Sequence, residues 1–205
     1  MIVVIDSLTG NLGSITNMLK KIGASAVISS SISDVERADK LILPGVGAFD
    51  SGMKNLHDLG LMPVLQHKVI TNRTPILGIC LGMQMFTTRS EEGNLPGLGW
   101  LDAETVRFKF DNDQTVQNVP HMGWNTVNVI RESALFDDMY SEPRFYFVHS
   151  YHVVCHNDED VVTKTFHGYD FASVIMRGNM IGVQFHPEKS HKFGMKLLKN
   201  FVNSF

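Results

Sequence analysis

The sequence lacks several features that would each indicate a particular class of protein. No stretch comes near the roughly 18 uninterrupted apolar residues of a membrane-spanning helix, and the amino terminus lacks a signal-peptide pattern, so we predict no membrane or targeting segment. A net charge of only −3 gives no electrostatic reason to expect nucleic acid or an anionic membrane as a partner. Internal repeats, low-complexity tracts and linkers are also missing, so residues 1–205 are expected to form a single domain.

Cysteine is scarce as well, since the chain contains only Cys80 and Cys155. Neither the cysteines nor the scattered histidines show the spacing of metal ligands, so we expect no metal site.

The most informative stretch is Gly78-Ile79-Cys80-Leu81-Gly82-Met83-Gln84. It follows the apolar run 74–77, which predicts a buried strand, and it precedes a segment in which a helix can form. A cysteine between two glycines on a strand-to-helix turn is the arrangement of a nucleophile elbow, with Cys in place of Ser. Flanking glycines permit a strained backbone there, and a helix amino terminus behind a cysteine favours the reactive thiolate. We therefore predict that Cys80 is a nucleophile. Because a disulfide would consume it, we interpret both cysteines as free thiols in a reducing cytoplasm.

A base for this nucleophile is predicted near the carboxyl terminus. Residues 180–185 form an apolar run that predicts a strand, and this strand leads into His186-Pro187-Glu188. A histidine can accept the thiol proton, and a carboxylate can hold the imidazole in its working tautomer. A lone cysteine on an apolar strand is more often a core residue than a catalytic one. The elbow and the strand-ending His-Pro-Glu reverse that expectation and predict a catalytic triad of Cys80, His186 and Glu188.

The order of the predicted elements indicates an α/β fold with a mostly parallel central sheet flanked by helices. Strands are expected at residues 2–6, 26–28, 40–43 and 74–77, and helices at residues 11–23, 32–39, 47–56 and 61–65. Consecutive strands then predict an added antiparallel section in the carboxyl-terminal half, at residues 98–110, 125–130, 145–154, 161–166 and 171–176, before a closing helix at 192–205. Ligands gather beyond the carboxyl ends of parallel strands, so the turn at residues 44–47, Cys80 and His186 are expected to lie together.

Five motifs carry a resemblance to a known family. GICLGMQ at residues 78–84 and QFHPEKS at residues 184–190 resemble the class I (triad) glutamine amidotransferases, and the resemblance runs along nearly the whole chain. It is closest to the HisH-type glutaminase subunit of imidazole glycerol phosphate synthase, through PGVGAF at 44–49, VPHMGWN at 119–125 and YFVHSY at 146–151. The resemblance implies a flavodoxin-like domain that hydrolyses L-glutamine to glutamate and ammonia without a cofactor.

The position of Leu81, directly after the nucleophile, makes its amide the expected first donor to the oxyanion of the tetrahedral intermediate. The resemblance places the second donor at Val46 or Gly47. Gln84 lies one helical turn beyond Cys80 and on the same face, and it resembles a residue that contacts the glutamine substrate.

The resemblance implies further substrate contacts outside the elbow. Glu92 resembles the acid that binds the substrate α-amino group, although its neighbour Glu91 remains an alternative. The strand that contains His149, Ser150 and Tyr151 resembles the one that holds the substrate α-carboxylate through backbone groups.

A partner protein is implied as well, because free ammonia would be lost to water. In the family, the partner is a (β/α)8-barrel cyclase that takes the ammonia through its interior and forms a heterodimer with the glutaminase. The resemblance places Asn11, Trp124, Tyr146 and Lys189 on the partner side, and exposed Trp and Tyr side chains are typical interface anchors.

The chain departs from the family pattern at one loop, and two alternative functions stay open. The family usually reads Asp-Tyr-Gly-x-Gly-Asn where this chain has Asp6-Ser7-Leu8-Thr9-Gly10-Asn11, in a loop that faces the partner. Residues 144–147 and 189–194 also resemble paralogous glutaminase subunits that accompany surface-polysaccharide genes and supply ammonia for an amidino sugar. The second alternative is a docking or regulatory module without catalysis, which the intact triad disfavours.

Overall fold

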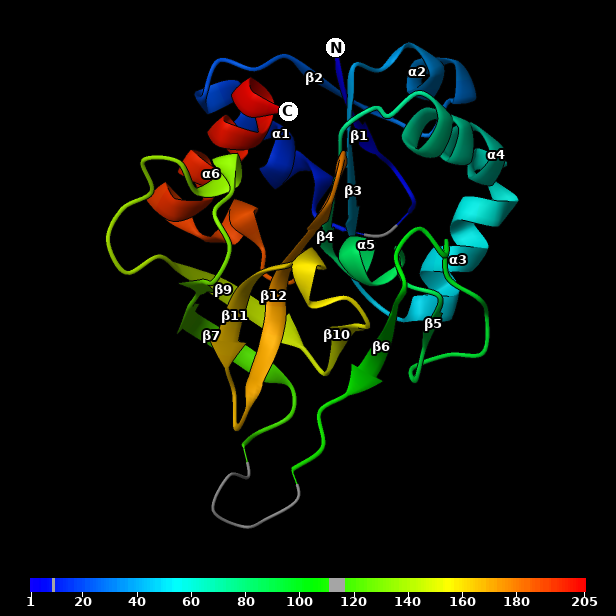
Figure 1. Cartoon of the computed structure of the whole chain (residues 1–205). Coiled ribbons are helices and arrows are strands. Elements are labelled where there is room, and N and C mark those ends of the chain that lie inside the picture. Colours follow the sequence, from blue (N-terminus) through cyan, green and yellow to red (C-terminus); the bar gives the residue numbers. More distant parts are fainter. Residues whose placement is uncertain (9, 111–116) are drawn as a thin grey trace.

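The computed structural model describes residues 1–8, 10–110 and 117–205, in which the parallel part of a large mixed sheet lies between two layers of helices (Figure 1). Its parallel part has the strand order β2-β1-β3-β4-β13. These strands are β1 (Ile2–Ile5), β2 (Ala26–Ser29), β3 (Lys40–Gly45), β4 (Ile76–Cys80) and β13 (Met180–Val183). The predicted α/β fold with a mostly parallel central sheet is confirmed.

Helices cover both faces of this parallel part, as Figure 1 shows. One layer consists of α1 (Leu12–Lys21) and α6 (His191–Ser204). The other contains α2 (Ile32–Arg37), α3 (Phe49–Asp58) and α4 (Leu61–Gln66), and α4 continues into a π-helical turn at His67–Thr71.

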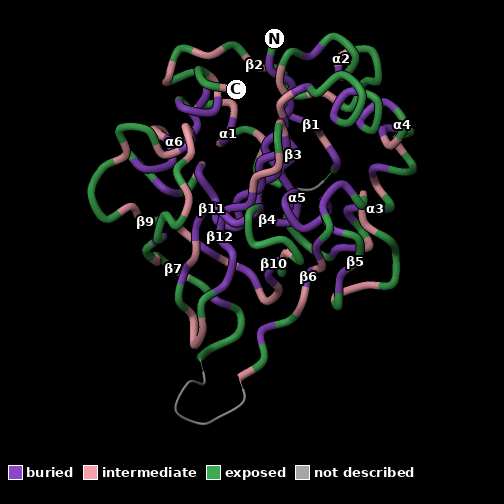
Figure 2. The backbone as a smooth tube through the Cα atoms, viewed as in Figure 1, coloured by how far each residue is buried: buried purple, intermediate pink, exposed green. Residues whose placement is uncertain are grey.

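The side chains of β1 point alternately to the two faces of the sheet, which explains why this strand is apolar throughout. Val3 and Ile5 pack in the core beneath α2, α3 and α4, whereas Ile2 and Val4 pack beneath α1 and α6. A strand covered on both faces has no polar side, so its sequence is a continuous apolar run. Figure 2 shows the resulting buried centre of the sheet, with exposed residues concentrated in the surrounding loops and helices.

Beyond β13 the sheet continues through strands that are mostly antiparallel, which confirms the predicted added section. These are β12 (Asp170–Arg177), β10 (Tyr151–Cys155), β6 (Ala103–Arg107) and β5 (Arg89–Ser90). In addition, β11 (Val161–Phe166) pairs with β12, and β8 (Asn128–Val129) pairs with β11. A separate antiparallel pair is formed by β7 (His121–Thr126) and β9 (Arg144–His149).

Three of the predicted strands have the wrong extent. The strand predicted at residues 145–154 is two strands, because β9 pairs with β7 in the small sheet, whereas β10, after Ser150, pairs with β6 in the large one. No glycine or proline interrupts residues 145–154, so the sequence pattern does not reveal the change of partner. The strand predicted at 98–110 is limited to β6, because residues 97–101 hydrogen-bond back to residues 85–88 in turns. The strand predicted at 125–130 is β7, which starts earlier, followed by β8.

No helix in residues 1–8, 10–110 or 117–205 is long and apolar enough to cross a membrane.

Candidate active site

Cys80 ends β4 and immediately precedes the one-turn helix α5 (Leu81–Gln84). Its backbone has a positive φ of 53° with ψ −109°, a conformation that side-chain-bearing residues rarely adopt, as expected for the strained turn of an elbow. The turn lies tightly against β3: a Cβ added to Gly82 would meet the carbonyl oxygen of Leu43 at 1.8 Å. Only glycine fits there, so the second glycine of the motif permits the close approach that presents the Cys80 thiol at the end of the sheet.

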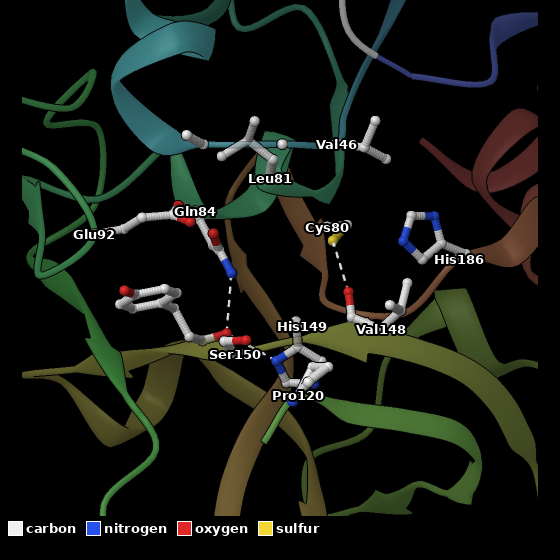
Figure 3. A pocket seen from close by; sticks show the side chains of 13 residues that line it. Val46, Cys80, Leu81, Gln84, Glu92, Pro120, Val148, His149, Ser150 and His186 are labelled. Atoms are coloured by element: carbon white, nitrogen blue, oxygen red, sulfur yellow. Dashed lines mark hydrogen bonds between the residues drawn. The ribbon is translucent and has the colours of Figure 1, made fainter. Parts of the chain in front are cut away.

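His186 follows β13, the strand next to β4, and faces the Cys80 thiol in Figure 3. Its Nδ1 atom lies 2.8 Å from the Glu188 Oε1 atom, and the two side chains are only 2% and 3% exposed. The backbone around the histidine is fixed by β9. The His186 amide donates to the Tyr146 carbonyl at 2.9 Å, and Ser190 Oγ donates to the His186 carbonyl at 2.6 Å.

The electrostatics of this arrangement favour a protonated His186. Burial on its own lowers the pKa of His186, but its pairing with Cys80 and then with Glu188 raises that pKa to about 10. Because Nδ1 is held by Glu188, Nε2 is the nitrogen left for proton exchange, and it has no hydrogen-bond partner within the described part of the chain. These contacts therefore favour a His186 imidazolium that keeps a proton taken from the thiol.

The Cys80 sulfur has two further polar neighbours that the sequence did not reveal. Its Sγ atom lies 4.0 Å from the Val148 carbonyl oxygen, as drawn in Figure 3. The Gln184 Nε2 atom donates to the same sulfur at 3.6 Å. A usable signal was present: Gln184 precedes His186 by two residues, and the period of an extended strand places such residues on one side.

A pocket of about 460 Å³ opens beside Cys80 and brings together every residue predicted to bind the oxyanion or the substrate. These residues are Val46, Gly47, Leu81, Gln84, Glu92, His149, Ser150 and Tyr151. Pro120, Val148 and Ala48, which the sequence analysis did not single out, also contribute to the wall. Ser150 and its neighbours line the pocket at the point where the chain passes from the small sheet into the large one.

The glycine turn after β3 has the conformation that its sequence suggests. Gly47 has a φ of +98°, which side-chain-bearing residues rarely adopt, and Val46 is exposed at the pocket wall.

Glu92 and Glu91 occupy different environments. Glu92 lines the pocket, its Oε2 atom accepts a hydrogen bond from the Phe49 amide at 2.9 Å, and burial raises its pKa. Glu91 is outside the pocket lining and accepts hydrogen bonds from the Arg107 amide and the Lys109 ammonium, both at 2.8 Å. Of the two acids, Glu92 is therefore the one placed to meet a ligand.

The wall opposite the elbow is supported by buried histidines. His149 Nδ1 lies 2.8 Å from the Tyr151 carbonyl oxygen, and His149 Nε2 lies 3.0 Å from His121 Nδ1. The Nδ1 atom of His149 must donate to the carbonyl, so its Nε2 accepts from His121. Burial lowers the pKa of His121 to about 4 and that of His149 well below its ordinary value. Burial also lowers the pKa of His152 to about 4. These rings are neutral at physiological pH.

Three of the residues predicted on the partner side form one surface cluster. Trp124 is 45% exposed and lies edge-on to Tyr146 with ring centroids 6.4 Å apart, and the Lys189 ammonium lies 5.6 Å from the Tyr146 ring centroid. His191 stacks on Trp124 with an interplanar angle of 3°. Asn11 is exposed at the start of α1, where its Oδ1 atom accepts from the Ser14 amide at 3.3 Å, and α1 packs against the Pro187–Lys189 turn.

The remaining cysteine lies outside the pocket lining. Cys155 is a free, half-buried thiol, and burial raises its pKa to about 12. Within residues 1–8, 10–110 and 117–205, no group of three or more His, Cys, Asp and Glu side chains could hold a metal ion.

A buried Cys-His-Glu array beside a pocket at the carboxyl ends of parallel strands is the arrangement of an amide hydrolase with a thiol nucleophile. Comparison with known proteins agrees with this class. The family model described as glutamine amidotransferase class-I matches residues 3–205. The structure of a glutamine amidotransferase from Thermotoga maritima has the same fold, with a TM-score of 0.69 and 16% sequence identity over 98% of this chain and 95% of that one.

Closer relatives define the group within this family. The chain is 51% identical to imidazole glycerol phosphate synthase subunit HisH 2 from Methanococcus maripaludis, over 98% of both chains. It is 52% identical to the subunit of the same name from Pseudomonas aeruginosa, again over 98% of both. The chain therefore belongs to the class I glutamine amidotransferases and, within them, to the HisH subunits of imidazole glycerol phosphate synthase. The resemblance and the prediction that the chain is a glutamine amidotransferase subunit are confirmed.

Proposed function

We propose that residues 1–205 form one glutaminase domain that hydrolyses L-glutamine to glutamate and ammonia, with Cys80, His186 and Glu188 as its catalytic triad. The observation that supports this most strongly is the buried His186, which faces the Cys80 thiol and lies 2.8 Å from the Glu188 carboxylate. A histidine held in this way is prepared to take a proton from the thiol and to keep it while the substrate is attacked.

The reaction then follows from the proton positions. His186 Nε2 accepts the thiol proton, and the Cys80 sulfur attacks the side-chain carbonyl carbon of glutamine. The negative charge that develops on the carbonyl oxygen is stabilised by the Leu81 amide and by an amide of Val46 or Gly47. When the C–N bond breaks, the imidazolium gives its proton to the departing nitrogen, which leaves as ammonia.

The second half regenerates the thiol. A water molecule attacks the glutamyl thioester while His186 Nε2 takes its proton. The C–S bond breaks and glutamate leaves, and the imidazolium proton returns to the Cys80 sulfur.

Substrate recognition in this proposal uses the other pocket residues. The Glu92 carboxylate pairs with the α-ammonium group, and the backbone of His149, Ser150 and Tyr151 holds the α-carboxylate. Gln84 donates from Nε2 to the Tyr151 carbonyl and to Gln184 Oε1, which leaves its own Oε1 atom for the substrate.

We propose further that the ammonia passes to a (β/α)8-barrel cyclase, with which the chain forms a heterodimer in the cytoplasm during histidine biosynthesis. Asn11, Trp124, Tyr146 and Lys189 would contact this partner. Exposed apolar side chains support the proposal that a partner covers this face. Leu8 in the variant loop is 67% exposed, and Met122, beside Trp124, is 63% exposed. Thr9 of that loop lies outside the described residues.

A second candidate acceptor is the amidino-sugar enzyme of the surface-polysaccharide paralogues. The two stretches that carry this resemblance meet in space. His191 stacks on Trp124, and Arg144 and Lys192 line the same surface pocket as these two rings. The feature that distinguishes the paralogues therefore lies on the face proposed to meet the partner.

The glutaminase activity is tested by measuring glutamate release from L-glutamine by the wild type and two variants. Cys80→Ala is expected to abolish release while its circular dichroism spectrum stays unchanged. Cys155→Ala removes the other thiol and is expected to keep wild-type activity. Retained hydrolysis in Cys80→Ala would overturn the assignment, and a silent wild type with every partner would favour a module without catalysis.

The acceptor is tested by adding each candidate synthase with its own substrate. Stimulation of glutamate release by the histidine-pathway cyclase is the expected result. Stimulation only by the amidino-sugar enzyme would replace this partner by the second candidate.

A further inference from the structure

We propose that Gln184 is a catalytic residue, whose side-chain N–H donates a fixed hydrogen bond to the Cys80 thiolate. The Gln184 side chain is fully buried, and its Nε2 atom lies 3.6 Å from Cys80 Sγ. This inference rests on the proposed function, since it assigns a task within the same thiol chemistry.

The direction of this hydrogen bond follows from the Tyr151 backbone carbonyl, which is connected to Gln184 through the Gln84 side chain. The Tyr151 carbonyl oxygen can only accept, so the Gln84 atom 3.0 Å from it must be the NH2 group. The same Gln84 nitrogen lies 3.1 Å from the Gln184 side chain, which must therefore present its oxygen to Gln84. The remaining end of the Gln184 amide, which faces the sulfur, is then its NH2 group.

This series of hydrogen bonds allows the Gln184 side-chain amide only one orientation. If the Gln184 amide were turned over, two NH2 groups would face each other, and a carbonyl oxygen would face the sulfur. His149 Nδ1 also donates to the Tyr151 carbonyl, at 2.8 Å, and so fixes the first acceptor of the series from the other side. The donor at the sulfur is thus set in advance and needs no rearrangement during the reaction.

A fixed donor at this position serves the thiolate in both halves of the reaction. The second neighbour of the sulfur, the Val148 carbonyl, accepts from the thiol but repels the thiolate. Gln184 supplies the opposite preference, because an N–H group binds the charged sulfur more strongly than the neutral one. It therefore favours proton transfer to His186 before attack, and it stabilises the sulfur again when the thiolate leaves the thioester.

The experiment measures the alkylation rate of Cys80 by iodoacetamide from pH 5 to pH 10 in a Cys155→Ala background, where Cys80 is the one remaining thiol. Gln184→Met keeps the length of the side chain and removes the N–H group. We expect the pH midpoint of alkylation to rise by about one pH unit, a tenfold loss of thiolate, because a hydrogen bond to a charged group is removed. Gln184→Glu places a carboxylate beside the sulfur and is expected to raise the midpoint further.

Gln66→Met is the matched control. Gln66 accepts a hydrogen bond from Trp100 Nε1 at 2.7 Å and lies outside the pocket lining, so this variant also removes a glutamine hydrogen bond and should leave the midpoint unchanged. A Gln184→Met midpoint within about 0.3 pH units of the wild type would overturn the proposal.

A second measurement applies if the Gln184 variants do not fold. In the wild-type protein, the NMR signals of the Gln184 side-chain NH2 group are expected to shift as Cys80 ionises, and this shift should be missing in Cys80→Ala. Gln184 NH2 signals that do not shift when Cys80 ionises would overturn the proposal. Because neither measurement uses glutamine, a failure of the Gln184 proposal is distinct from a failure of the glutaminase assignment.

Discussion

Glu188→Gln isolates the charge of the proposed triad acid from its geometry. A glutamine at this position can still offer Oε1 to the His186 Nδ1–H group at about the present 2.8 Å. Its NH2 group would replace Glu188 Oε2, a buried oxygen without a hydrogen-bond partner in the described part of the chain. The variant should therefore keep the imidazole tautomer and lose only the negative charge.

The size of the effect follows from the hydrogen bond between the two buried side chains. Glu188 is one of the groups that raise the pKa of His186, and its carboxylate accepts from the imidazole 2.8 Å away. A hydrogen bond to a charged group contributes about 1.5–3 kcal/mol, so losing the charge is expected to lower kcat/KM for glutamine roughly 10- to 150-fold.

The assay is glutamate release, measured alone and with the synthase that stimulates the wild type. Glu36→Gln on α2 is the control, because it removes an exposed carboxylate outside the site, and it should match the wild type. A kcat/KM of Glu188→Gln within threefold of the wild-type value would refute the reasoning that this charge stabilises the imidazolium.

Three other substitutions test the substrate contact and the buried histidine. Glu92→Gln should raise KM for glutamine roughly tenfold or more, because it removes the charge proposed to meet the α-ammonium group. Glu91→Gln should change KM less than twofold. The reverse pattern of KM values would exchange the roles of the two acids. His152 has a pKa of about 4 in the folded protein, so the unfolded chain binds more protons between pH 4 and pH 6.5, and stability falls as pH drops through this range. From pH 7 to pH 5, urea titrations should show the wild type losing about 2 kcal/mol more than His152→Gln, and equal losses would contradict the buried neutral ring.

The elements that organise the site were predictable because their signals are local. The apolar runs of the parallel strands, the Gly-Ile-Cys-Leu-Gly turn and the strand-ending His-Pro-Glu each carry their own pattern. The rule that ligands gather at the carboxyl ends of parallel strands was enough to bring Cys80 and His186 together in advance.

The parts that escaped prediction depend on partners distant in sequence. The change of sheet at Ser150 is not evident in residues 145–154, because a strand-like run without glycine or proline does not show which strand supplies the hydrogen bonds. Gln184 carried one local signal, its spacing of two residues from His186, but its task was missed. A glutamine within an apolar strand has no evident task until the fold places Gln84 and Cys80 beside it. Glu91 and Glu92 could be separated only by the pocket itself.

The central claim is that Cys80 forms a covalent glutamyl thioester with the substrate. The most direct measurement is peptide mass spectrometry of the protein after rapid acid quenching during turnover of L-glutamine, with the stimulating synthase present. The account predicts a glutamyl adduct on the peptide that contains Cys80, its loss in Cys80→Ala, and no adduct on the Cys155 peptide. Glutamine turnover with an unmodified Cys80 peptide, or an adduct that persists elsewhere in Cys80→Ala, would contradict it.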